Sequence, residues 1–564
     1  MDTRTLSYDF GIGNMPLIGH TIGKAFDETV RKFPDREAYV SRHQGIRWTY
    51  SELKEKVDAF AAGLIALGLV PGDRIGIWSP NKIEWIVTQF ATAKAGLIQV
   101  NINPAYRLHE LEYALNKSGC KAIITSDVFK TSHYLEMLRE LCPELDRATP
   151  GDLHAEKIPA LRAVIRMDSE KTPGMYNFAE IYGLGQATHV ERLKALEETL
   201  QFDDPINIQF TSGTTGSPKG ATLSHHNILN NANTCKASLR LTEKDRVCVP
   251  VPMYHCFGMV MCSLANVLAG ATSIFSSDSY DPQTVLETVT EEKCTVLHGV
   301  PTMFIAELEH PDFEKSDLRH LRTGFIGGAP CPVEVMKQIL DRMNMKEITI
   351  AYGMTELSPV VTTTALDDSL DRRTSTIGRA QPYQEVKIID ESGQVVPIGA
   401  PGELCVRGYN VMVGYWDDAE RTGEAIDAAG WMHTGDQAKM DAHGYMNIVG
   451  RIKDMVIRGG ENIYPREIEE FLFQHPKVQD VQVFGVPDPK FGEELCAWVK
   501  LREETTATEE EIREFCEGKI THFKIPRHIR FVESFPMTVT GKVQKFAMRE
   551  QMRAELNLAE AQTA

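Results

Sequence analysis

Strand-like and helix-like segments alternate through the first 350 residues, and this alternation restricts the fold more than any other feature. Thr49 and Glu52 fit a capping box that opens a helix. A buried strand is expected at Arg74–Trp78, then a helix at Lys82–Lys94 and a strand at Leu97–Ile102. Such alternation is typical of parallel sheets with helices on their faces. Further strands are expected at Ala122–Thr125, Ile206–Phe210, Thr272–Phe275, Val296–Gly299, Thr323–Ile326 and Ile348–Tyr352.

The pattern changes in the last third of the 564 residues, a length that favours two or more domains. Short strands among glycines over residues 383–450 indicate a small β-rich subdomain. We expect an α/β protein: an N-terminal domain, residues 1–452, of layered α/β subdomains plus the β-rich one, and a small α+β C-terminal domain, residues 453–564. The β-rich subdomain is expected to contain strands at Glu385–Ile389, Gly402–Val406 and Tyr445–Ile448. The C-terminal domain is expected to contain strands at Val478–Val486 and Cys496–Leu501 and helices at Pro465–Gln474 and Thr508–Ile520.

The composition excludes some classes of function. A formal net charge of −18 argues against nucleic-acid binding, because phosphate contacts need an excess of Lys and Arg. Small anionic ligands are not excluded. Eleven cysteines without a C-x-x-C pair suit reduced thiols better than disulfides or a zinc site. The sequence has no apolar run of membrane-spanning length and starts without a signal-peptide pattern. We therefore expect a cytoplasmic protein.

The stretch QFTSGTTGSPKGATLSH, residues 209–225, has two interpretations. Its composition is that of a flexible linker. Its glycines, hydroxyl residues and Lys219 are also suited to hold a phosphate chain through backbone N–H groups, hydroxyls and one cation. It is not a Walker loop, because Gly220 follows the lysine. Composition and spacing alone leave the two interpretations about equally supported.

Four further motifs follow in order. They are Tyr352-Gly353-Met354-Thr355-Glu356, then Thr434-Gly435-Asp436 with Gly450-Arg451, then Arg458-Gly459-Gly460-Glu461-Asn462, and finally the stretch from Pro536 to Gly541-Lys542. Taken singly, each is more often a turn or a solvated surface loop than a site. Taken together and in this order, they resemble the motifs of the adenylate-forming superfamily of AMP-binding enzymes. This superfamily includes acyl-CoA synthetases, peptide-synthetase adenylation domains and luciferases, and the resemblance covers essentially the whole chain.

The resemblance implies an ATP site. Tyr352 would lie against adenine, Thr355 would meet the α-phosphate, and Asp436 would accept hydrogen bonds from the ribose hydroxyls. Thr211 and Glu356 would hold Mg²⁺, which prefers hard oxygen ligands. Lys542, Thr355, Glu356 and His255 would be catalytic. The full set expected to contact ATP or AMP is Thr211, Ser212, Gly213, Thr214, Thr215, Gly216, Ser217, Pro218, Lys219, Gly328, Ala329, Tyr352, Gly353, Asp436 and Arg451.

The acyl group would lie in an apolar pocket. The segment PMYHCFG, residues 252–258, has no acidic residue where amino-acid-activating relatives carry an Asp, so a substrate ammonium would be buried unpaired. The lining suits an alkyl chain. The amino-acid sequence as a whole resembles the medium-chain fatty acyl-CoA synthetase branch. Aryl acids of the coumarate or benzoate type remain an alternative. The expected lining is Tyr254, His255, Phe257, Met259, Val260, Gly327, Met354, Val360 and Val361.

The implied activity has two half-reactions. A carboxylic acid attacks the α-phosphorus of Mg·ATP to give acyl-AMP, with Lys542 neutralising charge. The C-terminal domain then rotates about a hinge at Lys453 and presents the CoA-binding residues Arg458, Gly459, Gly460 and Glu461, and CoA thiol releases AMP.

The expected partners are the acid, ATP and CoA, with no nucleic acid and no membrane span. Relatives are often homodimers, and Lys542 lies in a pattern that lysine acetyltransferases modify in acyl-CoA synthetases. The rival from another class is a nucleotide-binding module without catalysis.

Overall fold

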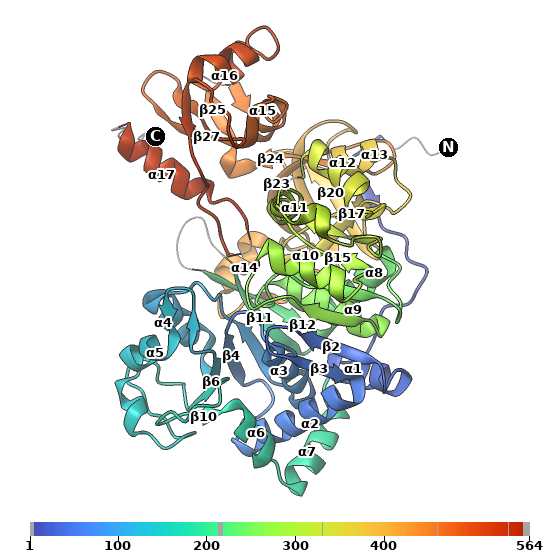
Figure 1. Cartoon of the computed structure of the whole chain (residues 1–564), viewed down its shortest axis with the longest axis vertical. Coiled ribbons are helices and arrows are strands. Elements are labelled where there is room, and N and C mark those ends of the chain that lie inside the picture. Colours follow the sequence, from blue (N-terminus) through green and yellow to red (C-terminus); the bar gives the residue numbers. More distant parts are fainter. Residues whose placement is uncertain (1–4, 212–217, 330, 459–460, 540, 557–564) are drawn as a thin grey trace.

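A computed structural model describes residues 5–211, 218–329, 331–458, 461–539 and 541–556. Eight of the predicted ATP and CoA contacts lie outside these residues: Ser212, Gly213, Thr214, Thr215, Gly216, Ser217, Gly459 and Gly460. Figure 1 shows the blue and cyan N-terminal elements at one end of the molecule and the orange and red C-terminal elements at the other.

The first sheet follows the predicted α/β alternation. Over the described residues it has the strand order β10-β9-β6-β4-β5-β11-β12-β22. Strands β10 to β11 run parallel, and β12 and β22 are antiparallel to their neighbours. The bounds are β4 Arg74–Trp78, β5 Ile98–Asn101, β6 Cys120–Thr125, β9 Ala163–Arg166, β10 Tyr176–Asn177, β11 Pro205–Thr211, β12 Lys219–Ser224 and β22 Gly414–Tyr415.

A second sheet, of nine strands in the described part of the chain, has the order β19-β18-β17-β16-β15-β13-β14-β2-β3. The strands from β17 to β2 are parallel. The bounds are β2 Glu37–Ser41, β3 Ile46–Thr49, β13 Arg246–Cys248, β14 Thr272–Phe275, β15 Val296–Leu297, β16 Thr323–Gly327, β17 Glu347–Gly353, β18 Val360–Thr363 and β19 Arg379–Ala380. The predicted strand at Val296–Gly299 is therefore two residues long.

Helices cover these sheets. The predicted capping box is confirmed, since Thr49 and Glu52 exchange hydrogen bonds at the start of α2. The bounds are α1 Ile22–Lys32, α2 Tyr50–Ala66, α3 Ile83–Ala95, α4 Leu108–Ser118, α5 Tyr134–Leu141, α6 Phe178–Leu184, α7 Ala187–Glu197, α8 His225–Ser238, α9 Ala265–Ala269, α10 Pro282–Glu291, α11 Pro301–Leu308, α12 Val333–Arg342, α13 Leu370–Ser375 and α14 Ala419–Ala425. A short hairpin joins β7 Val128–Phe129 to β8 Ser132–His133.

The β-rich subdomain is an antiparallel sheet of order β1-β20-β21-β23-β24 over the described residues. Its first strand, β1 Tyr8–Phe10, comes from the start of the chain, which sequence patterns did not predict. Local periodicity cannot reveal a pairing across such a sequence separation. The other bounds are β20 Gln384–Ile389, β21 Gly402–Gly408, β23 Met432–Met440 and β24 Met446–Arg451.

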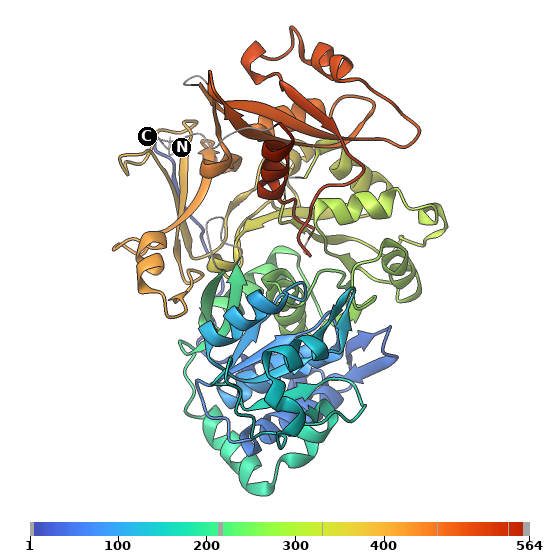
Figure 2. The ribbon, with the colours of Figure 1, turned by 90° about the vertical axis from the view of Figure 1, so that its left-hand side faces the viewer.

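The C-terminal segment forms its own sheet, in which β27 and β28 pair along ten residues or more each. Its core is separate and includes Val456, Leu472 and Val483. Figure 2 shows this red part above the yellow and green elements. The predicted helix at Thr508–Ile520 is shorter than expected. The bounds are β25 Val456–Arg458, β26 Glu461–Ile463, β27 Val478–Asp488, β28 Gly492–Leu501, β29 His528–Phe531, α15 Pro465–Leu472, α16 Glu509–Cys516 and α17 Lys545–Glu555.

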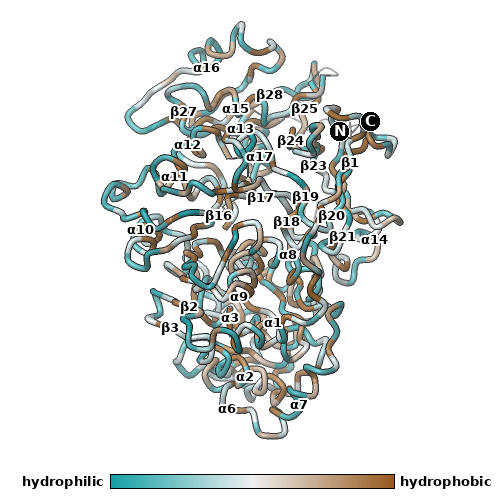
Figure 3. The backbone as a smooth tube through the Cα atoms, turned by 90° about the vertical axis from the view of Figure 1, so that its right-hand side faces the viewer, coloured by the Kyte–Doolittle hydropathy of each residue, from teal (hydrophilic) through white to brown (hydrophobic). Residues whose placement is uncertain are grey.

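Apolar side chains fill the space between the layers. The largest buried cluster runs from α1 through α8 and the two large sheets into the β-rich subdomain. Figure 3 shows hydrophobic segments inside, near β16 and β17, and hydrophilic ones along outer loops. All eleven cysteines are free. No helix among the described residues has the length and apolar character needed to cross a membrane.

Candidate active site

The buried carboxylate of Glu356 lies where the two large sheets meet. A short helical turn, Thr355–Leu357, follows β17 and places it. The Thr211 hydroxyl, at the end of β11, donates to Glu356 Oε1 over 3.2 Å, and the Tyr415 hydroxyl donates to the same oxygen over 3.0 Å. Glu356 is 6% exposed. Hard oxygen donors gathered around a buried carboxylate fit Mg²⁺.

A second carboxylate, Asp436, is held in place from two sides. The Tyr352 hydroxyl donates to its Oδ2 over 2.7 Å, and Arg451 Nε lies 3.1 Å from its Oδ1. Burial and then the Asp436 charge raise the pKa of Tyr352 well above its usual value, so the phenol stays protonated. The arrangement brings together Tyr352, Asp436 and Arg451, which are three of the predicted nucleotide contacts.

Lys542 reaches this region from the C-terminal domain. Its backbone N–H donates to Thr538 Oγ1 over 3.1 Å, and its C=O accepts from the Thr538 N–H over 2.8 Å, which closes a tight turn. Its Cε lies 3.4 Å from where a Cβ on Gly328 would be. Burial lowers the pKa of Lys542, while Cys256 and Glu356 nearby act in the opposite direction. The lysine is thus desolvated beside the predicted magnesium ligand.

The turn that carries Lys542 is seated on the N-terminal domain through Gly541. This glycine has φ +76°, and a Cβ there would lie 3.0 Å from both Val300 Cγ2 and Thr302 Oγ1. The Thr302 hydroxyl donates to the Gly541 carbonyl over 3.5 Å. Only a glycine combines this conformation with so close an approach.

His255 is an uncharged hydrogen-bonding group. Burial and then the Lys542 ammonium lower its pKa to about 3. Its Nδ1 accepts from the Phe257 N–H over 3.1 Å, which places the ring proton on Nε2. The Thr355 hydroxyl lies 3.7 Å from the thiol of the adjacent Cys256. His255 can therefore donate a hydrogen bond, but it cannot supply positive charge at neutral pH.

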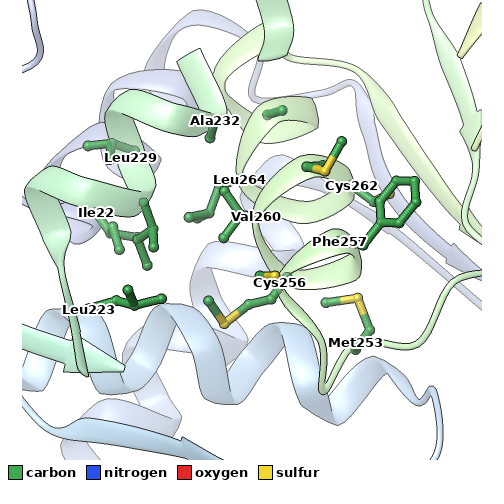
Figure 4. Packing of buried hydrophobic residues seen from close by; sticks show 14 of the residues in the cluster. Ile22, Leu223, Leu229, Ala232, Met253, Cys256, Phe257, Val260, Cys262 and Leu264 are labelled. Atoms are coloured by element: carbon green, nitrogen blue, oxygen red, sulfur yellow. The ribbon is translucent and has the colours of Figure 1, made fainter. Parts of the chain in front are cut away.

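Three of the expected acyl-pocket residues, Phe257, Met259 and Val260, lie on a π-helix, Phe257–Leu264, which the sequence patterns did not predict. Buried side chains support its backbone: Gln89 Nε2 donates to the Met259 carbonyl over 3.1 Å, and Ser263 Oγ donates to Gln89 Oε1 over 2.7 Å. Figure 4 shows Phe257 and Val260 leaving this helix on different sides. The other expected lining residues are Tyr254, His255, Gly327, Met354, Val360 and Val361, all buried or partly buried.

A cavity of about 310 Å³ lies between the N-terminal domain and residues 537–539 and 541. It is lined by Pro80, Phe129, Lys130, Tyr280 and Thr302 among others. None of the expected acyl-pocket residues lines it.

The Arg458–Glu461 hairpin, formed by β25 and β26, is engaged within the C-terminal domain. Arg458 Nε lies 2.6 Å from Glu494 Oε1, and its guanidinium lies 4.2 Å from the centre of the Phe491 ring. Lys453 lies in a short helical turn after β24, where burial lowers its pKa. The structure therefore brings Lys542, and not Arg458, to the carboxylates.

Other predicted residues lie around the same region. Lys219 Nζ lies 4.9 Å from the centre of the Tyr415 ring. Pro218 precedes β12, Gly353 ends β17, and Gly327 ends β16, followed by Gly328 and Ala329. Sequence patterns missed Tyr415 and Thr302. Tyr415 reaches Glu356 only because β22 pairs with β12, and nothing in the local sequence signals that pairing.

Two family models match the chain: the AMP-binding enzyme model over residues 26–416, and the AMP-binding enzyme C-terminal domain model over residues 467–542. The chain belongs to the AMP-binding enzyme family.

Curated relatives and solved structures agree with this membership. A relative in Danio rerio, named medium-chain acyl-CoA ligase ACSF2, mitochondrial, is 48% identical and covers 99% of this chain and 92% of its own. The human protein of that name is 46% identical, with coverage of 98% and 91%. The ATP-bound MatB structure from Rhodopseudomonas palustris has a TM-score of 0.78 and 29% identity, and covers 94% of this chain and 99% of its own.

The family confirms several sequence predictions. The fold is α/β, with a large N-terminal and a small C-terminal domain. The chain is an AMP-forming acyl-CoA synthetase, with ATP and CoA as substrates. The amino-acid-activating and non-catalytic alternatives are set aside by the same findings.

Proposed function

We propose that this enzyme activates a medium-chain fatty acid as acyl-AMP and transfers the acyl group to CoA, releasing AMP and pyrophosphate. The observation that carries the proposal is the convergence of Glu356, Asp436 and Lys542 on one region from three distant segments. The vertebrate relatives named medium-chain acyl-CoA ligases support the choice of substrate.

In the first half-reaction the carboxylate attacks the α-phosphorus of ATP and pyrophosphate leaves. Residues 211–219 bind the phosphates, Tyr352 lies against adenine, and Asp436 accepts hydrogen bonds from the ribose hydroxyls. Lys542, desolvated beside Glu356, offsets the negative charge that develops on the α-phosphate oxygens. His255, neutral, donates through Nε2 near the reacting carboxylate.

Glu356 and the Thr211 hydroxyl would hold Mg²⁺, which supplies charge neutralisation on the phosphates when bound. The Tyr415 hydroxyl orients the Glu356 carboxylate. Replacing Glu356 with Gln keeps its shape but removes the charge, and should raise the Mg²⁺ concentration needed for half-maximal adenylation.

In the second half-reaction CoA thiol attacks the acyl-AMP carbonyl. We place the domains at residues 1–452 and 453–564, with the hinge at Lys453. Rotation about the hinge withdraws Lys542 and brings the Arg458–Glu461 face to the site. One mobile domain thus serves both chemistries.

The substrate test is ATP–pyrophosphate exchange with acids from acetate through octanoate to palmitate, and with benzoate and 4-coumarate. Thioester formation is then measured with CoA. The proposal expects the highest kcat/KM with acids of about octanoate length, because apolar burial adds about 0.8 kcal/mol per CH₂ until the pocket is filled. A maximum with benzoate or 4-coumarate would replace the fatty-acid assignment with an aryl-acid one.

We further propose that acetylation of Lys542 switches adenylation off, because it removes the ammonium charge. Enzyme carrying acetyl-lysine at this position should lose exchange activity, and unchanged exchange would refute the switch.

The predicted cytoplasmic location and homodimer stay predictions. Cell fractionation tests the location, since the Danio rerio and human relatives are named mitochondrial. Sedimentation tests the dimer.

A further inference from the structure

The segment that carries Asp436 is a bulge between two antiparallel strands. The register shifts between Glu403 and Cys405 on β21, so residues 434–436 of β23 lie opposite Leu404 alone. Bulges beside active sites redirect a side chain. The direction of the Asp436 carboxylate therefore depends on whatever holds this bulge in shape.

One side chain, Glu403, holds the bulge from the neighbouring strand. Its Oε1 accepts the Gly435 N–H over 3.1 Å, and its Oε2 lies 2.9 Å from His433 Nδ1, which must be the donor because a carboxylate only accepts. Gly435 has φ +70°, the left-handed conformation that favours glycine. The two carboxylate oxygens thus fix the residues on either side of position 434.

The remaining bonds pass the constraint on to Asp436. Thr434 Oγ1 donates to the Leu404 carbonyl over 2.7 Å and accepts the Asp436 N–H over 3.1 Å. On the far side of the histidine ring, Nε2 lies 3.9 Å from Asp427 Oδ2. The chain of contacts runs from Asp427 through His433 and Glu403 to the backbone beside Asp436.

The same cluster resembles a metal site, because ligand atoms of Glu403, Cys405 and His433 lie within 4.8 Å of one another. Two observations argue against that use. Both Glu403 oxygens already accept hydrogen bonds, and burial raises the pKa of the Cys405 thiol to about 12, so it stays protonated. The cluster satisfies its own polar groups, as a positioning network does.

We propose that Glu403 is a positioning residue for nucleotide binding: by holding Gly435 and His433, it sets the direction in which Asp436 presents its carboxylate to the ribose hydroxyls of ATP. This rests on the proposed ribose contact of Asp436. A small misplacement of such a carboxylate weakens its hydrogen bonds without removing any group that touches the reacting atoms.

The test measures adenylation kinetics with ATP, 2′-deoxy-ATP and 3′-deoxy-ATP in the full-length enzyme. Glu403→Ala should raise the KM for ATP about tenfold, the size expected for weakened hydrogen bonds to a charged group, with kcat nearly unchanged. Its preference for ATP over the deoxy analogues should fall toward one. Glu403→Gln keeps an acceptor for the Gly435 N–H and should restore most of that preference.

Asp436→Ala and the double variant Glu403→Ala/Asp436→Ala complete a cycle. If Glu403 acts through Asp436, the double variant should resemble Asp436→Ala alone rather than show added losses. Glu385→Ala is the matched control: this carboxylate lies on the same sheet, is 22% exposed against 21% for Glu403, and binds Arg407 instead. It should leave the preference unchanged.

The outcomes separate the two proposals. If Asp436→Ala keeps the preference for ATP, the proposed ribose contact fails. If Asp436→Ala loses the preference but Glu403→Ala keeps it, and only thermal stability falls, Glu403 is structural and the positioning role is overturned. Additive losses in the double variant would overturn it as well.

Discussion

The turn that carries Lys542 and the Arg458–Glu461 hairpin, which we propose as the two functional faces of the C-terminal domain, are held in different ways. The turn at Thr538–Lys542 is seated on the N-terminal domain, with Gly541 against Val300 and Thr302. The Arg458–Glu461 hairpin is paired inside its own domain, through Glu494 and Phe491. The difference fits the proposed domain alternation, in which Lys542 is at the site during the adenylation half-reaction. Because the two faces have separate contacts, a substitution in one of them leaves the contacts of the other in place.

The largest expected effect comes from Lys542→Ala. Adenylation should fall by about 10²–10³-fold, the usual cost of removing a group that stabilises transition-state charge. Thioester formation from supplied acyl-AMP should be nearly unchanged, because the hairpin face is intact. The two half-reactions are measured separately, by pyrophosphate exchange and by thioester detection. Lys545→Ala, which loses only a pair with Glu469, is the control. If Lys542→Ala lowers both half-reactions equally, the proposal that the two faces serve different half-reactions is contradicted.

A smaller effect is expected from Gly541→Ala, which should unseat the turn without removing the lysine. The added Cβ would lie 3.0 Å from Val300 and Thr302, in a backbone conformation with φ +76°. Adenylation should fall about tenfold, as strain and contact together cost about 1–3 kcal/mol. Gly518→Ala is a matched control, because Gly518 has φ +68° but no neighbour within 4 Å. If both variants lose the same activity, backbone strain and not seating is responsible.

Arg458→Ala should have the opposite effect to Lys542→Ala. Thioester formation should fall by a few-fold to about tenfold, while pyrophosphate exchange should change little. Arg530→Ala is the control, since Arg530 likewise pairs with a glutamate, Glu555, at 2.7 Å and lies 4.5 Å from the centre of the Trp498 ring. If Arg458→Ala lowers only pyrophosphate exchange, the proposed role of Arg458 in CoA binding is contradicted.

The smallest effect is a difference in pH dependence between the half-reactions. Burial lowers the Lys542 pKa, so the active ammonium loses its proton at a lower pH than an exposed lysine would. Adenylation should therefore decline as pH rises through that pKa, while thioester formation from acyl-AMP should not follow it. Rate profiles of wild type and Lys542→Arg check this, because a guanidinium stays charged. An alkaline decline that persists in the arginine variant must come from another group.

Much of the fold could be predicted from local patterns. Arg74–Trp78 and Thr272–Phe275 are strands with the predicted bounds, and the Thr49 and Glu52 capping box is present. These features depend on near neighbours, so sequence alone contains the information. The π-helix at Phe257–Leu264 was not predictable, because Gln89, far away in the sequence, supports its backbone.

The candidate site also has a part that could be predicted from the sequence and a part that could not. The sequence by itself identified the residue types and their order, from Thr211 to Lys542, because motif spacing within one family is a local property. Only the tertiary structure decided which of them meet. Tyr415 reaches Glu356 through pairing of β22 with β12, and Glu403 reaches the bulge beside Asp436 through pairing of β21 with β23. Strand pairing between distant segments is set by packing of the whole domain, which no short stretch of sequence encodes.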